Sequence, residues 1–219
     1  ISACLVGSEM CIRDSFIPVY EKSGLISRLD RYIWEQAAAK LGEWKKAGIN
    51  MSISVNISPK DFYYIDIFNT FAGLIKKYDI EPSNLKIEIT ETTIMSDVPN
   101  LMGELEELRK AGFTLEMDDF GSGYSSLNTL KDINVDVLKV DMGFIKETKN
   151  VKKSRIILAS VIKMAKELNL LIITEGVETE EQVDNLTKLG CDVFQGYYFS
   201  KAIDVNEFEK RYLYRKKAG

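Results

Sequence analysis

Short apolar runs alternate with longer amphipathic stretches along most of the chain. The short runs are rich in β-branched residues and too short for exposed helices, which indicates strands. The longer stretches carry apolar residues at helical spacing, which indicates helices between the strands. The six candidate strands are Met51–Ile57, Leu85–Thr90, Phe113–Asp118, Val135–Val140, Leu170–Thr174 and Asp192–Gln195. The candidate helices are Arg28–Lys46, Ile67–Tyr78, Asn100–Lys110, Ser154–Leu168, Glu180–Leu189 and Val205–Tyr214.

This alternation predicts an α/β fold with a mostly parallel sheet. Repeated strand–helix units in 219 residues suit either a (βα) barrel or a doubly wound open sheet. Gly48, Gly112 and Gly190 follow helical stretches and precede strands, where a residue with positive φ ends a helix at low steric cost. The chain has no linker rich in Pro, Gly or Ser and is long enough to bury a substantial core, so we expect one domain.

The chain contains no histidine. Catalysis by Ser-His or Cys-His pairs and zinc sites with histidine ligands are therefore excluded, because all of them need an imidazole. The three cysteines form neither a disulfide framework nor a usual zinc pattern. Any chemistry must rest on carboxylates, amides, lysine and hard metal ions.

Charge and hydropathy argue against two classes of partner. The formal net charge of -4 disfavours a general duplex nucleic-acid-binding protein, which needs cations to neutralise phosphates. No apolar run approaches the roughly 20 residues that span a bilayer, and the start lacks the features of a signal peptide. We therefore expect a cytoplasmic protein without a membrane segment.

Unusual polar residues gather at the C-terminal ends of the candidate strands. In a parallel barrel these ends meet at one rim, which is where barrels of this kind place their active sites. Six strands in succession follow the pattern, so chance is a poor explanation. The residues are Asn56, Glu88 and Glu91, Asp118 and Asp119, Lys139 and Asp141, Glu175 and Glu178, and Gln195.

Some of these residues also have a purely structural interpretation. A carboxylate just beyond a strand is often a helix cap, which stays an equal alternative for Asp141 and for Glu178. Lys139 could cover apolar surface with its stem and keep its ammonium in water. Its place between Leu138 and Val140 on an apolar strand favours instead an ammonium that points into a charged cavity.

The pair Asp118–Asp119 before FGSGYSSL is the most specific local signal. Two adjacent carboxylates repel each other unless they are exposed or hold a cation. Together with Asn56 and Glu88 they form an oxygen-only set, which favours Mg²⁺ or Mn²⁺ over zinc. Gly121 and Gly123 make the following segment pliable, as in a loop that rearranges over a ligand.

With these motifs the chain resembles the EAL family of cyclic di-GMP phosphodiesterases. The resemblance runs from about Phe16 to Ala202, in the family's order and at close to its spacing. The matching segments are FIPVYEKSGLI, SVNIS, KIEITET, MDDFGSGYSSL, LKVD, ITEGVET and GCDVFQGYYFS.

The resemblance implies a modified TIM-type (βα)₈ barrel and a homodimer. It also implies two Mg²⁺ or Mn²⁺ ions at the C-terminal rim that activate a water, which hydrolyses one phosphodiester bond of cyclic di-GMP to give linear pGpG. Asn56, Glu88 and Asp118 would be ligands of the first ion. Asp118 would also bridge to a second ion held by Asp119.

Further roles follow from the same resemblance. Lys139 and Glu175 would position or deprotonate the attacking water, and Gln195 would assist near the phosphate or its water. Glu91 would anchor the loop after Asp119, which in the family links metal binding to dimer contacts. The loop residues concerned are Phe120, Gly121, Ser122, Gly123, Tyr124 and Ser125.

The sequence departs from the family at its start. The Glu-Ala-Leu tripeptide, whose glutamate completes the first ion's ligands, is absent from the 219 residues. Residues 1–15 match no family motif and resemble the translation of a sequencing adaptor joined to a partial read; Glu9 is the only glutamate there that could replace the missing ligand. Six strands instead of eight also imply an incomplete barrel. We therefore expect residues 16–219 to form a partial domain with little or no activity.

Two other functions stay open. A degenerate domain could sense cyclic di-GMP without cleaving it, although a site that holds no metal has little use for so many converging charges. A structural or interaction role would make Phe120–Leu127 and Tyr197–Phe199 dimer or core elements.

Overall fold

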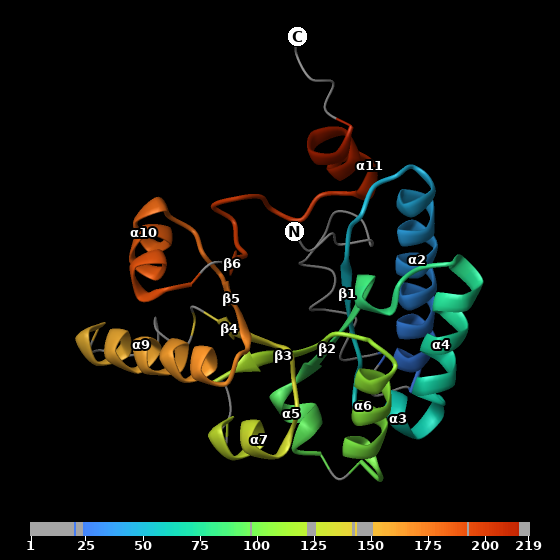
Figure 1. Ribbon diagram of the computed structural model, residues 1–219, viewed down its shortest axis with the longest axis horizontal. Helices are drawn as coiled ribbons and strands as arrows, with labels where there is room; N and C mark the ends of the chain where they lie inside the picture. Colours follow the sequence, from blue (N-terminus) through green and yellow to red (C-terminus); the bar gives the residue numbers. More distant parts are fainter. Residues whose placement is uncertain are drawn as a thin grey trace.

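The computed structural model describes residues 20, 24–96, 98–121, 126–141, 143, 151–191 and 193–214. Within them, six strands form one sheet in the order β1 to β6, and every neighbouring pair is parallel (Figure 1). The strands are β1 Ile53–Asn56, β2 Leu85–Thr90, β3 Leu115–Phe120, β4 Val137–Asp141, β5 Leu171–Glu175 and β6 Val193–Phe194. Strand order never reverses, so the sheet is the curled half of a barrel and the doubly wound alternative is wrong.

Helices cover the outer face of the curled sheet (Figure 1). The five longest connect successive strands or lead into β1: α2 Ile26–Lys46, α4 Ile67–Tyr78, α6 Leu101–Lys110, α9 Val151–Glu167 and α10 Glu180–Leu189. Shorter helices are α3 Asp61–Tyr64, α5 Glu91–Ile94, α7 Ser126–Asp132 and α11 Val205–Phe208, with a 3₁₀ turn at Pro82–Asn84 and a π turn at Glu209–Leu213. No helix in this described part combines the length and apolar character that a membrane crossing needs.

The hydrophobic core lies between the sheet and these helices. On β2, Ile87 and Ile89 are fully buried, and so are Trp34 on α2 and Phe71 on α4, whose ring centroids lie 5.0 Å apart. Successive side chains of a strand point to opposite faces. The residues between the core positions, such as Glu88, therefore face the concave interior of the half-barrel, where the candidate site lies.

Helix ends follow the expected chemistry. Gly48, Gly112 and Gly190 have φ of 74°, 94° and 97°, so these glycines adopt the left-handed conformation that the sequence predicted for them. Thr179 and Gln182 form a capping box at the start of α10. These caps explain why α10 has the predicted bounds.

The C-terminal segment returns to the first described helix. Phe208 packs against Trp44 of α2 with 5.9 Å between ring centroids, and the Trp44 indole N–H donates to Glu209 Oε1 at 2.8 Å. The single helix predicted over Val205–Tyr214 is in fact α11 followed by the π turn. The contact joins segments that lie 165 residues apart in the sequence.

Candidate active site

The structure brings the predicted strand-end residues to one rim. Asn56 is the last residue of β1 and lies in register with Glu88 of β2. Glu175 is the last residue of β5, in register with Asp141 at the end of β4. Because all six described strands are parallel, these ends lie on the same side of the sheet. The rim predicted from the sequence is thus present.

Lys139 is the centre of the site. Its ammonium lies 2.7 Å from Glu88 Oε1, 2.8 Å from Glu175 Oε1 and 3.2 Å from Asp118 Oδ1. Only 4% of the lysine side chain is exposed. The three carboxylates come from three strands other than β4, which carries Lys139, and these contacts rule out a lysine whose ammonium extends into water.

The carboxylates around Lys139 outnumber its single positive charge. Burial alone would lower the pKa of Lys139, but attraction by Glu88, Asp118 and Glu175 outweighs it and raises this pKa well above the usual value. Burial raises the pKa of Glu88 although Lys139 opposes the shift. Burial likewise raises the pKa of Glu175 to about 7, against the attraction of Lys139. Carboxyl groups that are hard to ionise beside a lysine indicate a site with too little positive charge.

Asn56 is held from two sides. Its backbone carbonyl accepts from the Trp34 indole N–H at 2.9 Å, and its Nδ2 atom donates to Glu88 Oε2 at 3.0 Å. Donation through Nδ2 fixes the amide plane and directs the amide oxygen away from Glu88. Asn56 is itself exposed, so this oxygen can serve as a ligand at the rim.

Asp118 and Asp119 lie where the ladder between β3 and β4 shifts register, between Met117 and Phe120. Asp119 has φ of 56°, a left-handed conformation that is uncommon for residues other than glycine. Its backbone N–H donates to Asp118 Oδ1 at 2.9 Å. Burial raises the pKa of Asp119, and the charges of Asp118 and Asp141 add to the effect. Bulged, strained strand ends of this kind are typical of functional sites.

The donor set at the rim suits a hard divalent cation. It consists of one amide and several carboxylates, with neither imidazole nor thiolate among them. Among the described residues, no three Asp, Glu or Cys side chains already surround a common point closely enough to form a metal cage. Lys139 lies among Glu88, Asp118 and Glu175 instead. The shortage of positive charge and the oxygen-only chemistry nevertheless fit Mg²⁺ or Mn²⁺.

The remaining predicted residues, Gln195, Asp141 and Glu178, lie in different segments and make different contacts. Gln195 directly follows β6, where its backbone N–H donates to the Thr174 carbonyl at 2.8 Å. Asp141 Oδ1 accepts from the Gly143 backbone N–H, a local turn contact that agrees with the capping alternative. The charge of Asp141 nevertheless helps to raise the pKa of Asp119. Glu178 is exposed in the segment before α10.

The predicted loop is described only at its edges. Phe120 is buried as the last residue of β3, so the strand continues two residues beyond the predicted end at Asp118. Gly121 follows with φ of 98°, and Glu91 is buried at the start of α5, which contacts both β3 and α7. The predicted loop residues Ser122, Gly123, Tyr124 and Ser125 lie outside the described residues.

Sequence reasoning missed three interior residues: Ser54, Lys86 and Glu116. Each stands two positions before a site residue on the same strand, and Glu116 is only 1% exposed. The signal was available, because Lys86 and Glu116 interrupt apolar strands with the same period of two as Glu88 and Asp118.

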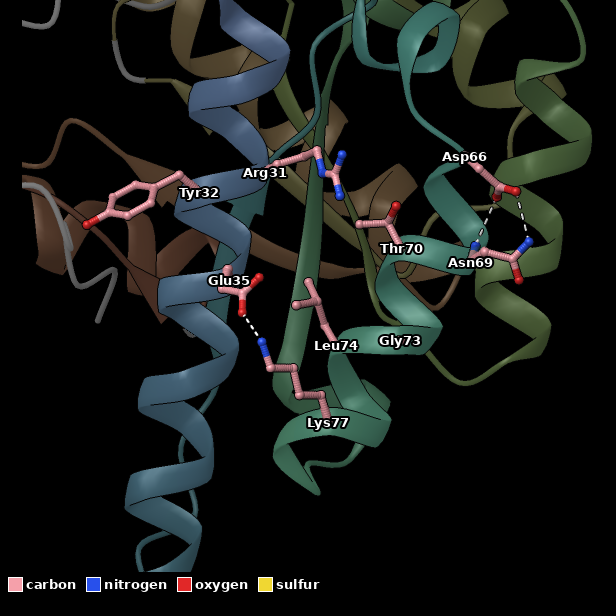
Figure 2. A pocket seen from close by; sticks show the side chains of 9 residues that line it. All are labelled: Arg31, Tyr32, Glu35, Asp66, Asn69, Thr70, Gly73, Leu74 and Lys77. Atoms are coloured by element: carbon pink, nitrogen blue, oxygen red, sulfur yellow. Dashed lines mark hydrogen bonds and ion pairs between the residues drawn. The ribbon is translucent and has the colours of Figure 1, made fainter.

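A separate groove of about 650 Å³ lies outside the barrel, between α2 and α4 (Figure 2). Both of its carboxylates already have partners: Glu35 pairs with Lys77, and Asp66 accepts from Asn69. None of the candidate site residues lines the groove. It is therefore a poor candidate for the active site.

Comparison with known proteins gives the family. The family model described as "EAL domain" matches residues 7–202. The chain belongs to the EAL domain family. The match begins within the opening fifteen residues, nine residues before the Phe16 at which the resemblance was expected to start.

One relative of this EAL domain is a named signalling enzyme of Pseudomonas aeruginosa. The chain is 34% identical over 193 residues to the bifunctional diguanylate cyclase/cyclic di-GMP phosphodiesterase MucR of Pseudomonas aeruginosa, covering 88% of this chain and 28% of the relative. It thus spans little more than a quarter of that protein.

Solved EAL structures agree in fold. The PaMucR phosphodiesterase in complex with c-di-GMP has a TM-score of 0.82 and 34% identity, with 90% of this chain and 80% of the other covered. The manganese/cy-diGMP complex of Klebsiella pneumoniae BlrP1 has a TM-score of 0.70 and 29% identity, with 80% and 44% covered. These likenesses confirm the incomplete, TIM-barrel-like fold.

Proposed function

We propose that this EAL domain hydrolyses one phosphodiester bond of cyclic di-GMP to give linear pGpG, with the help of two Mg²⁺ or Mn²⁺ ions. The observation that carries the proposal is the buried Lys139 with Glu88, Asp118 and Glu175 around its ammonium at the rim. The named activity of MucR and the cyclic dinucleotide in the PaMucR and BlrP1 complexes support this substrate. The manganese in the BlrP1 complex supports the choice of cation.

The rim residues divide into cation ligands and groups that handle the water. Asn56, Glu88 and Asp118 would hold the first ion, and Asp118 with Asp119 the second. When bound, two divalent cations lower the pKa of a bound water and offset the charge that builds up on the phosphate. A histidine base is then unnecessary, in keeping with the absence of histidine from the sequence.

Glu175 is the candidate base. In the chain without bound cations, burial raises the pKa of Glu175 to about 7, so this carboxyl group can exist in both protonation states near neutral pH, as a group that accepts and releases a proton must. Lys139 lies 2.8 Å from this carboxylate and would orient it, and its positive charge would lie near the scissile phosphate of a bound substrate. Gln195, held through its backbone to Thr174, would direct its amide to the phosphate or the water.

One observation favours a second candidate function, a sensor that binds cyclic di-GMP without cleaving it. The 219 residues contain no Glu-Ala-Leu tripeptide, so the first ion has one carboxylate fewer than the family's full set. Fewer carboxylates weaken a divalent site. We therefore expect turnover by this chain to be slow.

The decisive experiment measures binding and turnover separately. Cyclic di-GMP binding is titrated with Ca²⁺ present, and pGpG formation is followed by anion-exchange chromatography with Mn²⁺. The hydrolase proposal expects binding and slow turnover that Glu175→Gln abolishes while the exposed Glu180→Gln control does not. Binding without turnover would establish the sensor, and absence of binding would leave a structural or interaction role.

We also propose that the domain works as a cytoplasmic homodimer. The support is that α5, which begins at the buried Glu91, contacts α7, the helix that starts at Ser126. Sedimentation equilibrium with and without Mn²⁺ tests the assembly, and a monomer under both conditions contradicts it.

A further inference from the structure

A second set of polar side chains lies inside the half-barrel, one interior position before the residues around Lys139. We call Ser54, Lys86 and Glu116 the lower layer. Side chains two positions apart on a strand share a face of the sheet. The lower layer therefore faces the same interior as the site. Its members precede Asn56 on β1, Glu88 on β2 and Asp118 on β3 by two residues each.

Glu116 contacts both other members of the lower layer. Its Oε2 atom accepts from the Ser54 hydroxyl at 2.8 Å, and its Oε1 atom lies 3.0 Å from the Lys86 ammonium. β1 and β3 are not neighbours, because β2 lies between them. The carboxylate of Glu116 on β3 thus reaches across β2. One of its oxygens contacts β1 and the other contacts β2, so three strands are linked.

The contacts of Glu116 lie in the part of the sheet that carries the candidate cation ligands. Asn56, Glu88 and Asp118 are each carried by one of the three tied strands, so the curvature of β1 to β3 sets the spacing of their oxygens. A carboxylate that is only 1% exposed must keep its partners, because an unpaired buried charge is strongly unfavourable. The contacts of Glu116 therefore favour a single curvature of strands β1 to β3.

We propose that the lower layer is a positioning device for the cation site: Glu116, held by Lys86 and Ser54, fixes the spacing of Asn56, Glu88 and Asp118. The inference rests on the proposed function in that it concerns the same cations. It assigns a role to residues that touch neither the cations nor the substrate. The competing explanation is that the layer only fills the barrel interior.

The test replaces both charges together, so that neither is left buried and unpaired. The variant is Lys86→Met/Glu116→Leu, and its matched control is Lys40→Met/Glu209→Leu, which removes another partly buried pair, at 3.4 Å between α2 and the C-terminal π turn. Mn²⁺ affinity is measured by electron paramagnetic resonance of the free ion. Urea unfolding in EDTA reports stability separately.

We expect the lower-layer variant to bind Mn²⁺ about tenfold more weakly, as is typical when residues that support metal ligands are removed. The control and the charge-conserving Lys86→Arg should bind Mn²⁺ as the unaltered chain does. A layer that only fills space would change the urea midpoint and leave the Mn²⁺ affinity of the folded chain unchanged. That result would overturn the proposal.

A second measurement needs no metal and therefore separates this inference from the proposed function. The Asn56 side-chain amide gives ¹⁵N–¹H signals, assigned by their loss in Asn56→Ala, that report its donation to Glu88. If the unaltered chain takes up no Mn²⁺, the proposed cation chemistry fails, but the lower layer is still judged by these signals. We expect them to shift in Lys86→Met/Glu116→Leu and not in the control; unshifted signals contradict the positioning role.

Discussion

Lys139 on β4 and Glu175 on β5 face each other across 2.8 Å, although Lys139 is in register with Ile173 rather than with Glu175. The pair is therefore diagonal, and the ammonium leans toward the rim. There it also meets Glu88 and Asp118 from two further strands. The Lys139 ammonium is thus the counter-charge of three carboxylates. The stability of the site should therefore depend both on this charge and on pH.

Removing the lysine should destabilise the metal-free chain. Lys139→Met leaves three carboxylates without a counter-charge, and we expect a loss of about 3–5 kcal/mol in the free energy of unfolding. Mn²⁺ should restore part of the loss because it supplies the missing positive charge. Urea unfolding in EDTA and in Mn²⁺ measures both effects. Lys77→Met, which breaks an exposed pair with Glu35, should change stability far less because water screens the pair; equal losses in the two variants would contradict the expectation.

The pKa of Glu175 predicts how stability depends on pH. It is raised from 4.5 to about 7 in the folded chain, so the folded state binds this proton more tightly than the unfolded state. The resulting stability is fully present below pH 4.5 and is lost as pH rises to about 7, by at most about 3 kcal/mol. Unfolding in EDTA from pH 4.5 to 8 measures the slope. Glu175→Gln should flatten it and Glu180→Gln should not; an unchanged slope in Glu175→Gln would assign the pH dependence to other groups.

The Asn56 amide should matter for cation binding more than for folding. Asn56→Ala removes both the candidate ligand oxygen and the donation to Glu88, and we expect Mn²⁺ affinity to fall about 10- to 100-fold. Calorimetric titration of Mn²⁺ measures the change. Asn69→Ala is the matched control, because Asn69 likewise donates its amide to a carboxylate, that of Asp66. A similar loss in the control would mean that the effect is not specific to the rim.

The glycine after Gln195 has no room for a side chain. A Cβ at Gly196 would lie 2.1 Å from the Val177 carbonyl oxygen and 2.3 Å from its backbone nitrogen. Gly196→Ala should therefore force β6 and the segment after β5 apart and lower the unfolding free energy by about 1–3 kcal/mol. Gly73 on α4 has open space, so Gly73→Ala should raise stability by about 0.5–1 kcal/mol. Thermal unfolding of the two variants should give shifts of opposite sign.

Local chemistry made much of the fold predictable. α4 and α10 have the predicted bounds because Asp66 and Thr179 cap their first turns. The rim residues were found because polar groups at the ends of apolar strands are unusual in sequence. Family resemblance, rather than spacing, supplied their separate roles.

Long-range geometry could not be read from the chain. The register shift that gives Asp119 its left-handed conformation depends on how β3 pairs with β4. The contact between Ser54 and Glu116 joins residues 62 apart and requires a curled sheet. Alternation of polar and apolar residues can show that both side chains face inward, but it cannot show which of them meet.

The indole contacts described above give the chain built-in optical probes. It has two tryptophans, both buried: Trp34 donates to the Asn56 backbone, and Trp44 donates to Glu209. In Trp44→Phe the remaining emission would come from the indole beside the rim, and in Trp34→Phe from the indole under the C-terminal segment. Events at the cation site and detachment of the chain's end can thus be followed by fluorescence as two separate signals, without attaching a dye.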